Sequence, residues 1–248
     1  MKPFHFISII LLITSTISCK VLSYSELPEP NIKTRKFKLK GWQGLSDKRN
    51  INFGGYYTKN YHRGANLDNT SLFLPSLTEN ISGLKEVQFQ QFIPSGDSSK
   101  LYAQETLNRK GIELHELDDP ENANHIIYEH KVRGKIQFEK DSTASFEIDL
   151  NSDKEQSIFS EGKFKNMKIN YFNYYEDNNG GQRRVIGADI LYDSKVIAAF
   201  RQGKDGAFEY ERCWVWIQKR EDINENLVLA SLISLLADLN RVDIHGKL

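Results

Sequence analysis

The chain has 248 residues, and its 33 lysines and arginines balance its 33 aspartates and glutamates, so that the formal net charge is +0. A chain that is not basic overall lacks the electrostatic footprint of nucleic-acid-binding proteins, and we expect no nucleic-acid partner. The length suits one large all-β domain or two small ones.

Residues 1–18 have the layout of a secretory signal peptide. Lys2 precedes a mostly apolar run over 4–13, and small and polar residues follow it as far as Ser18. A positive start, a short apolar stretch and small residues before a cleavage point are typical of such peptides. The apolar run is well short of the about 20 residues needed to span a bilayer. We therefore expect export.

Cys19 follows this signal directly, in the place where bacterial lipoprotein precursors carry the cysteine that receives lipid. The segment resembles a lipobox, with the small residue Ser18 before the cysteine, although Thr16 replaces the usual leucine and Ile17 the usual small residue. The resemblance implies lipid (palmitate) on Cys19, a membrane anchor in the cell envelope, and a polar tether over 19–33. The same bond also suits an ordinary secretory peptidase, which would leave a secreted or periplasmic soluble protein.

The segment Lys36-Phe37-Lys38-Leu39-Lys40 alternates charged and apolar residues. Such alternation predicts a strand, within 34–42, that has one solvated face. A second interpretation stays open because this basic block follows the tether directly. Lys36, Lys38 and Lys40 could contact the head groups of anionic lipids.

The rest of the N-terminal part, 34–124, is predicted to be irregular. Residues 42–70 are rich in glycine, asparagine and aromatic residues, which is typical of loops with short strands. A strand over 84–93 is followed by a turn, and a short helix is expected over 100–109. The acidic stretch 113–124 is expected to be a loop.

From His125 onward, runs of strand-forming residues alternate with short turn signals. This spacing predicts an antiparallel β-meander, in a barrel or a sandwich. The expected strands cover residues 125–138, 143–150, 157–160, 163–175, 183–192, 195–201 and 207–218.

The last of these strands carries an aromatic stripe. Its members share one face by the two-residue period of a strand, and we expect them in the core. They are Phe208, Tyr210, Arg212, Trp214 and Trp216. Cys213 is expected to be a buried, inert thiol. If Cys19 carries no lipid, the two cysteines could instead form a disulfide.

Residues 225–241 predict a helix of unusual composition, with Asp222 or Asn224 as its N-cap. No residue between Glu225 and Asp238 is charged. A helix on the outside of a sheet should show a charged face, so most of the circumference of this one must be buried. We expect it to be enclosed by β-strands. A place between a sheet and a partner subunit is the alternative.

The run over 188–200, the aromatic strand Tyr210–Ile217, the turn at Asp222 and the apolar helix together resemble the end of the tubby-like superfamily. That group includes tubby domains, phospholipid scramblases and LURP-one-related proteins. The resemblance covers about 163–240 and implies an antiparallel barrel closed around a C-terminal apolar helix. It carries over no functional residue, and it suggests membrane or lipid association only by analogy.

No sequence motif of a known catalytic or cofactor site is present: there is no P-loop, dinucleotide-binding fingerprint, His-Glu-x-x-His or Gly-x-Ser-x-Gly. His125 and His130 are five residues apart and would point to opposite faces of a strand, so we expect no metal site and no cofactor.

We therefore divide the chain into a signal peptide (1–18), a lipidated tether (19–33) and a single, mainly β (α+β) domain (34–248) whose meander and helix lie in 125–248. The expected function is that of an exported, membrane-anchored lipoprotein. Its domain would be a non-enzymatic binding module for an envelope protein, a lipid or a small apolar ligand. The alternative is an envelope hydrolase whose site is dispersed over 42–124.

Overall fold

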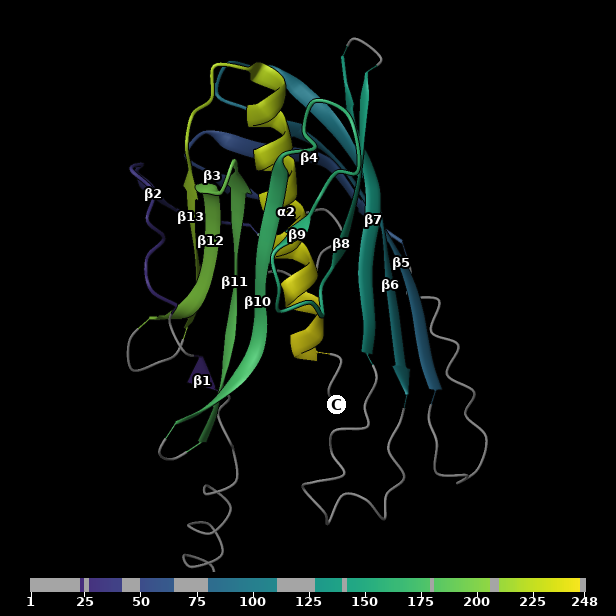
Figure 1. The fold of residues 1–248 in the computed structure, drawn as a ribbon, viewed down its shortest axis with the longest axis vertical. Helices are drawn as coiled ribbons and strands as arrows, with labels where there is room; N and C mark the ends of the chain where they lie inside the picture. The colour runs from purple at the N-terminus through teal and green to yellow at the C-terminus, as the bar shows by residue number, and fades with distance from the viewer. Residues whose placement is uncertain are drawn as a thin grey trace, which may run out of the picture.

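The structure, a computed structural model, describes residues 23–24, 27–41, 50–64, 80–110, 128–139, 142–178, 181–205 and 210–245. It has two β-sheets with a single described helix, α2 (Ile223–His245), between them (Figure 1). The predicted fold class, mainly β with one C-terminal helix, is confirmed. The predicted signal peptide, Cys19 and the acidic loop over 113–124 lie outside the described residues.

The first sheet, sheet A, has the strand order β2-β13-β12-β11-β10-β9, and β1 pairs with β11 beside this path. Its strands are antiparallel except for the parallel pair β1–β11. They are β1 (Ser23–Tyr24), β2 (Lys36–Lys38), β9 (Gln156–Ser157), β10 (Met167–Asn178), β11 (Gly181–Tyr192), β12 (Lys195–Asp205) and β13 (Tyr210–Ile217). The predicted meander is thus present as consecutive antiparallel neighbours.

The second sheet, sheet B, is antiparallel throughout, and its strand order follows the chain. It consists of β3 (Asn52–Phe53), β4 (Tyr56–Arg63), β5 (Asn80–Phe92), β6 (Ser98–Lys110), β7 (Tyr128–Phe138) and β8 (Thr143–Asp149).

The short helix predicted over 100–109 is wrong, because these residues form β6. Leu101, Ala103 and Glu105 are buried and alternate with outward residues, which is the two-residue period of a strand. Lysine, leucine, alanine and glutamine are good helix formers, but β6 pairs along its length with β5 on one side and β7 on the other. Pairing on both sides outweighs a propensity that amounts to tenths of a kcal/mol per residue.

The two sheets meet at both lateral edges and form a shell. At one edge the backbone of Lys40 pairs with that of Asn52, with N···O distances of 2.9 and 3.0 Å. At the other, the amide of Glu147 in β8 donates to the carbonyl of Ile158 just after β9, at 3.0 Å. The helix contacts β5, β6 and β7 of sheet B and β12 and β13 of sheet A, so the shell encloses it (Figure 1).

The helix is buried around its whole circumference, as its sequence predicts. Leu229, Leu232, Ile233 and Leu236 are all 0% exposed. Asp222 is the N-cap, because its Oδ1 accepts a hydrogen bond of 2.8 Å from the amide of Asn224.

Three buried polar side chains form a stripe on the helix that faces sheet B. The hydroxyl of Ser231 lies 3.2 Å from that of Ser99, and Ser234 donates to Gln91 Oε1 at 2.7 Å. Farther along, Asp238 Oδ2 lies 3.7 Å from Arg63 Nη1. These contacts to three different strands fix the rotation of the helix inside the shell.

The described part of the predicted aromatic stripe faces away from the helix, which corrects its expected place around it. Cys213, Val215 and Ile217 belong to the core cluster around the helix, so that Trp214 and Trp216 lie on the other face of sheet A. Trp216 is nevertheless buried, with 4% of its surface exposed. Phe208 and the side chain of Tyr210 lie outside the described residues. Apolar residues occur on both faces of β13, so the two-residue period of a strand could not show which face packs against the helix. The expectation of a buried thiol at Cys213 is confirmed, since that residue is 2% exposed.

Residues 23–24 and 27–34 are here called the strap. Residues 23–24 form β1 and pair with β11, and residues 27–34 continue along the outer face of sheet A. Two hydrogen bonds hold this segment. Arg201 Nε donates to the Pro28 carbonyl at 3.3 Å, and Thr34 Oγ1 donates to the Ile217 carbonyl at 3.0 Å. Leu27 lies over Gly187, where an added Cβ would come within 3.0 Å of its Cδ1. The described part of the predicted tether is therefore packed against the domain.

Candidate functional site

The three lysines predicted to contact lipid form a row on the outer face of sheet A. Lys36 lies opposite Trp216 and Lys38 opposite Trp214 in the β2–β13 register. The amide of Leu39 donates to the Cys213 carbonyl at 2.8 Å, which continues this pairing toward Lys40. Directly opposite residues of an antiparallel pair share a face. Lys36, Lys38 and Lys40, the lysine row, are all exposed on it.

Lys36 differs from the other two because its charge is engaged. Its Nζ lies 4.6 Å from the ring centroid of Trp214 and 5.2 Å from that of Trp216. The same nitrogen donates to Glu29 Oε1 of the strap at 2.7 Å. The ammonium group therefore connects the strap to the two indoles, and its role here is structural.

Lys38 and Lys40 make no ion pair within the described part of the chain. Their ammonium groups are in solvent, and the carboxylate nearest along the strap, Glu29, is used by Lys36. Two such cations, on a segment that pairs with the strand carrying Trp214 and Trp216, suit an anionic surface at which the charges stay hydrated.

Some residues of this surface could not be found from the sequence. Trp214 and Trp216 were placed in the core, and Glu29 was part of a featureless tether. Both errors concern which residues become neighbours across the sheet. The sequence does not show this, because β2 and β13 pair although they are separated by more than 170 residues. The charged and apolar alternation of 36–40 was a sufficient signal for the lysine row itself.

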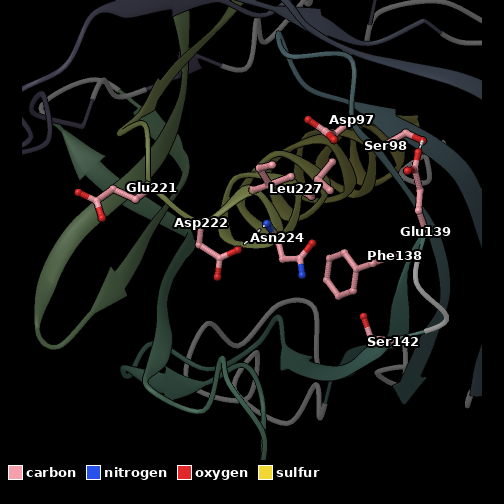
Figure 2. Close-up of a pocket in the computed structure, with 10 residues that line it drawn as sticks. Asp97, Ser98, Phe138, Glu139, Ser142, Glu221, Asp222, Asn224 and Leu227 are labelled. Atoms are coloured by element: carbon pink, nitrogen blue, oxygen red, sulfur yellow. Dashed lines mark hydrogen bonds between the residues drawn. The ribbon is translucent and has the colours of Figure 1, made fainter.

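A second feature is the cavity of about 460 Å³ at the end of the shell where α2 begins (Figure 2). Phe138, Leu227 and Ile223 supply its apolar part. The remaining lining residues are polar or acidic: Asp97, Ser98, Glu139, Ser142, Glu221, Asp222 and Asn224. Lys163 forms an ion pair with Asp222 from outside the lining. The mouth of the cavity is therefore anionic.

A third feature is a charged cluster buried inside sheet B. Glu105 of β6 lies 2.7 Å from Nε2 of His130 on β7 and 3.9 Å from Nζ of Lys85 on β5. All three side chains are less than a tenth exposed. The His130–Glu105 contact is a hydrogen bond between two buried side chains. His125, which was predicted to point to the opposite face of the strand from His130, lies outside the described residues.

Within the described residues, no three histidine, cysteine, aspartate or glutamate side chains converge in a way that could hold a metal ion. The described helix is also not apolar and long enough, by hydropathy, to cross a membrane. Comparison of the chain with protein-family models, with the sequences of curated proteins and with solved structures gives no match. The surface, the cavity and the cluster must therefore be interpreted from their own geometry.

Proposed function

We propose that the chain is an exported lipoprotein, anchored through lipid on Cys19, whose domain is a non-enzymatic binding module that contacts anionic lipid head groups through the lysine row. The observation that carries this proposal is the exposure of Lys38 and Lys40, without ion pairs among the described residues, on the strand that follows the N-terminal strap. A membrane anchor upstream of the strap would keep this surface close to lipid.

The interior of the shell is filled, which favours binding on the outer surface over binding of a ligand inside. The helix fills the space between the sheets, and its residues from Leu227 to Leu239 are all 2% exposed or less. A small apolar ligand would have to displace this helix to enter the core. The tubby-like resemblance of the sequence adds lipid association as a theme of that group by analogy.

The first experiment measures sedimentation of the Cys19→Ser variant, which carries no lipid, with vesicles rich in anionic lipid. Each lysine near such a surface contributes about 1 kcal/mol, so Lys38→Gln with Lys40→Gln should lower the partition coefficient roughly 30-fold at low salt. The control is Lys165→Gln with Lys195→Gln, which removes two exposed lysines elsewhere on the protein. Binding of the parent should fall steeply with salt, because the Debye length is about 10 Å at 0.1 M.

Equal losses in the two double variants would indicate a general charge effect and contradict a specific surface. Binding that is absent at low salt would remove lipid as the partner and leave an envelope protein in its place.

The second experiment tests the anchor. The wild-type protein should carry an acyl group on Cys19 by mass spectrometry and sediment with membranes, whereas Cys19→Ser should be released from them or remain unprocessed. A variant that fractionates like the wild type, together with no acyl group on the latter, would contradict the lipoprotein proposal and favour a secreted or periplasmic protein.

The hydrolase alternative keeps one specific observation in its favour. A carboxylate that orients a histidine is the arrangement that activates a nucleophile in hydrolases, and Glu105 and His130 have it. Lys85 and Glu105 lie in the range 42–124 from which such a site was expected. A hydrolytic activity that survives purification and is lost in His130→Gln, with the fold retained, would support the enzyme and contradict the binding module.

A further inference from the structure

The two ends of the shell differ in structure. At one end, here called the pocket end, α2 begins, and the turns β5–β6 and β7–β8 border the cavity of Figure 2. The opposite end, the hairpin end, is where β10 and β11 are joined between Asn178 and Gly181. Figure 1 shows the helix running from the first end to the second, with β1 near the second. The helix has 23 residues, so the ends are about 35 Å apart.

The strap leads the N-terminal side of the chain to the hairpin end. Ser23 and Tyr24 pair with Arg183 and Arg184, which are the third and fourth residues of β11 counted from the hairpin. From there the strap runs along sheet A to Lys36, opposite Trp216 near the other end of β13. The direction of the strap is thus fixed by pairing at both of its ends.

Arg201 holds the middle of the strap in place. Its side chain is buried, forms an ion pair of 2.7 Å with Asp189, and donates to the carbonyls of Ala188 and Phe200 as well as that of Pro28. The guanidinium group also lies 5.4 Å from the ring of Phe172. A buried arginine with this many partners is a rigid attachment point, so the strap does not act as a long flexible linker.

Cys19 precedes Ser23 by four residues, which span at most about 14 Å even when fully extended. A lipid on Cys19 would therefore hold the hairpin end within about 14 Å of the bilayer, a fraction of the length of the shell. We infer that the hairpin end is the end of the shell nearer the membrane and that the pocket end is the farther one, with the outer face of sheet A, which carries the lysine row, turned toward the lipid. This inference rests on the proposed lipidation of Cys19.

The direction of the lysine row is consistent with this orientation. Lys40 follows the β2–β13 pairing toward the hairpin end, and Lys36 lies farthest from that end. Lys38 and Lys40, which make no ion pair among the described residues, are therefore on the part of the row nearer the membrane.

The test uses the full lipidated protein in vesicles whose lipids carry a quencher at the head group. One fluorophore is attached at Glu129→Cys, an exposed site at the start of β7, and another, in a separate variant, at Ser95→Cys in the turn at the pocket end. Native Cys213 is buried and should not be labelled. We expect marked loss of fluorescence for the label at 129 and little loss for the label at 95.

The control inserts twelve Gly and Ser residues between Cys19 and Ser23, which adds a reach of about 19 Å. The difference between the two labels should then shrink. If the two labels are quenched equally without the insertion, or the label at 95 is quenched more strongly, the orientation is wrong. Mass spectrometry decides the lipoprotein proposal separately, because an acyl group on Cys19 would leave that proposal intact. Absence of that acyl group overturns both.

Discussion

At the scale of single residues, burial decides what a charged side chain contributes. Arg133 and Glu147 lie on the surface with their charged atoms 2.9 Å apart, and both are more than half exposed. Glu105 has its partners Lys85 and His130 inside the sheet, where all three are less than a tenth exposed. An exposed pair contributes about 0–1 kcal/mol because water screens it. A buried pair is costly to break, because removal of one partner leaves the other charge without compensation.

We therefore expect Glu105→Gln to lower the free energy of unfolding by about 3 kcal/mol, because it removes the charge of a buried carboxylate that contacts both His130 and Lys85. Glu147→Gln is the matched control and should change that free energy by less than about 1 kcal/mol. Urea unfolding followed by far-UV circular dichroism measures both. Similar values for the two variants would show that Glu105 is not held in a low-dielectric environment.

At the scale of elements, α2 is the part of the fold that the sequence predicts best. A long run without charges cannot lie on a surface, so the burial of this helix followed from composition. The choice between enclosure by strands and a place against a partner subunit did not. The rotation of the helix did not follow, because it depends on which strands offer partners to Ser231, Ser234 and Asp238.

The strands were predicted less evenly than the helix. Regular turn signals located those of the meander, whereas β6 was taken for a helix because its residues are good helix formers. The lysine row was found from its alternation, but its indole partners were not. The reason is the same in both cases: strand pairing is decided by residues far away in the chain, and a local pattern does not contain that information.

Substitution within the helix tests its enclosure. We expect Leu232→Asp or Ile233→Asp to prevent stable folding, because an unpaired buried carboxylate costs several kcal/mol, comparable with the stability of a whole domain of about 5–15 kcal/mol. Ile223→Asp is the control, since this first residue of the helix is 47% exposed. It should melt within a few degrees of the wild type in a thermal scan. Wild-type melting of the two core variants would rule out an enclosed helix.

At the scale of the whole molecule, the helix makes the two sheets interdependent. Both inner faces pack against α2, and the sheets share few backbone hydrogen bonds at their lateral edges. Neither sheet therefore has a complete core without the helix, although within each sheet every described strand pairs with a neighbour.

This interdependence predicts a single cooperative unfolding transition for the described domain. In a Trp42→Phe variant the remaining tryptophans are Trp214 and Trp216 of sheet A. Its urea unfolding followed by tryptophan fluorescence should coincide with unfolding followed by far-UV circular dichroism, which reports on both sheets. Two separate midpoints would show that the sheets are independent folding units.

The position of α2 after all described strands also affects the order of events during biosynthesis. A chain delivered N-terminus first presents both sheets to solvent before the residues that fill them have appeared. The hydrophobic inner faces then have nothing to pack against, and the native domain cannot form on a partly delivered chain. Under the proposed export this delay would be an advantage, because a polypeptide that has not yet folded can be threaded through a narrow translocation channel. The emerging strands would then need chaperones on the far side of the membrane until the helix arrives.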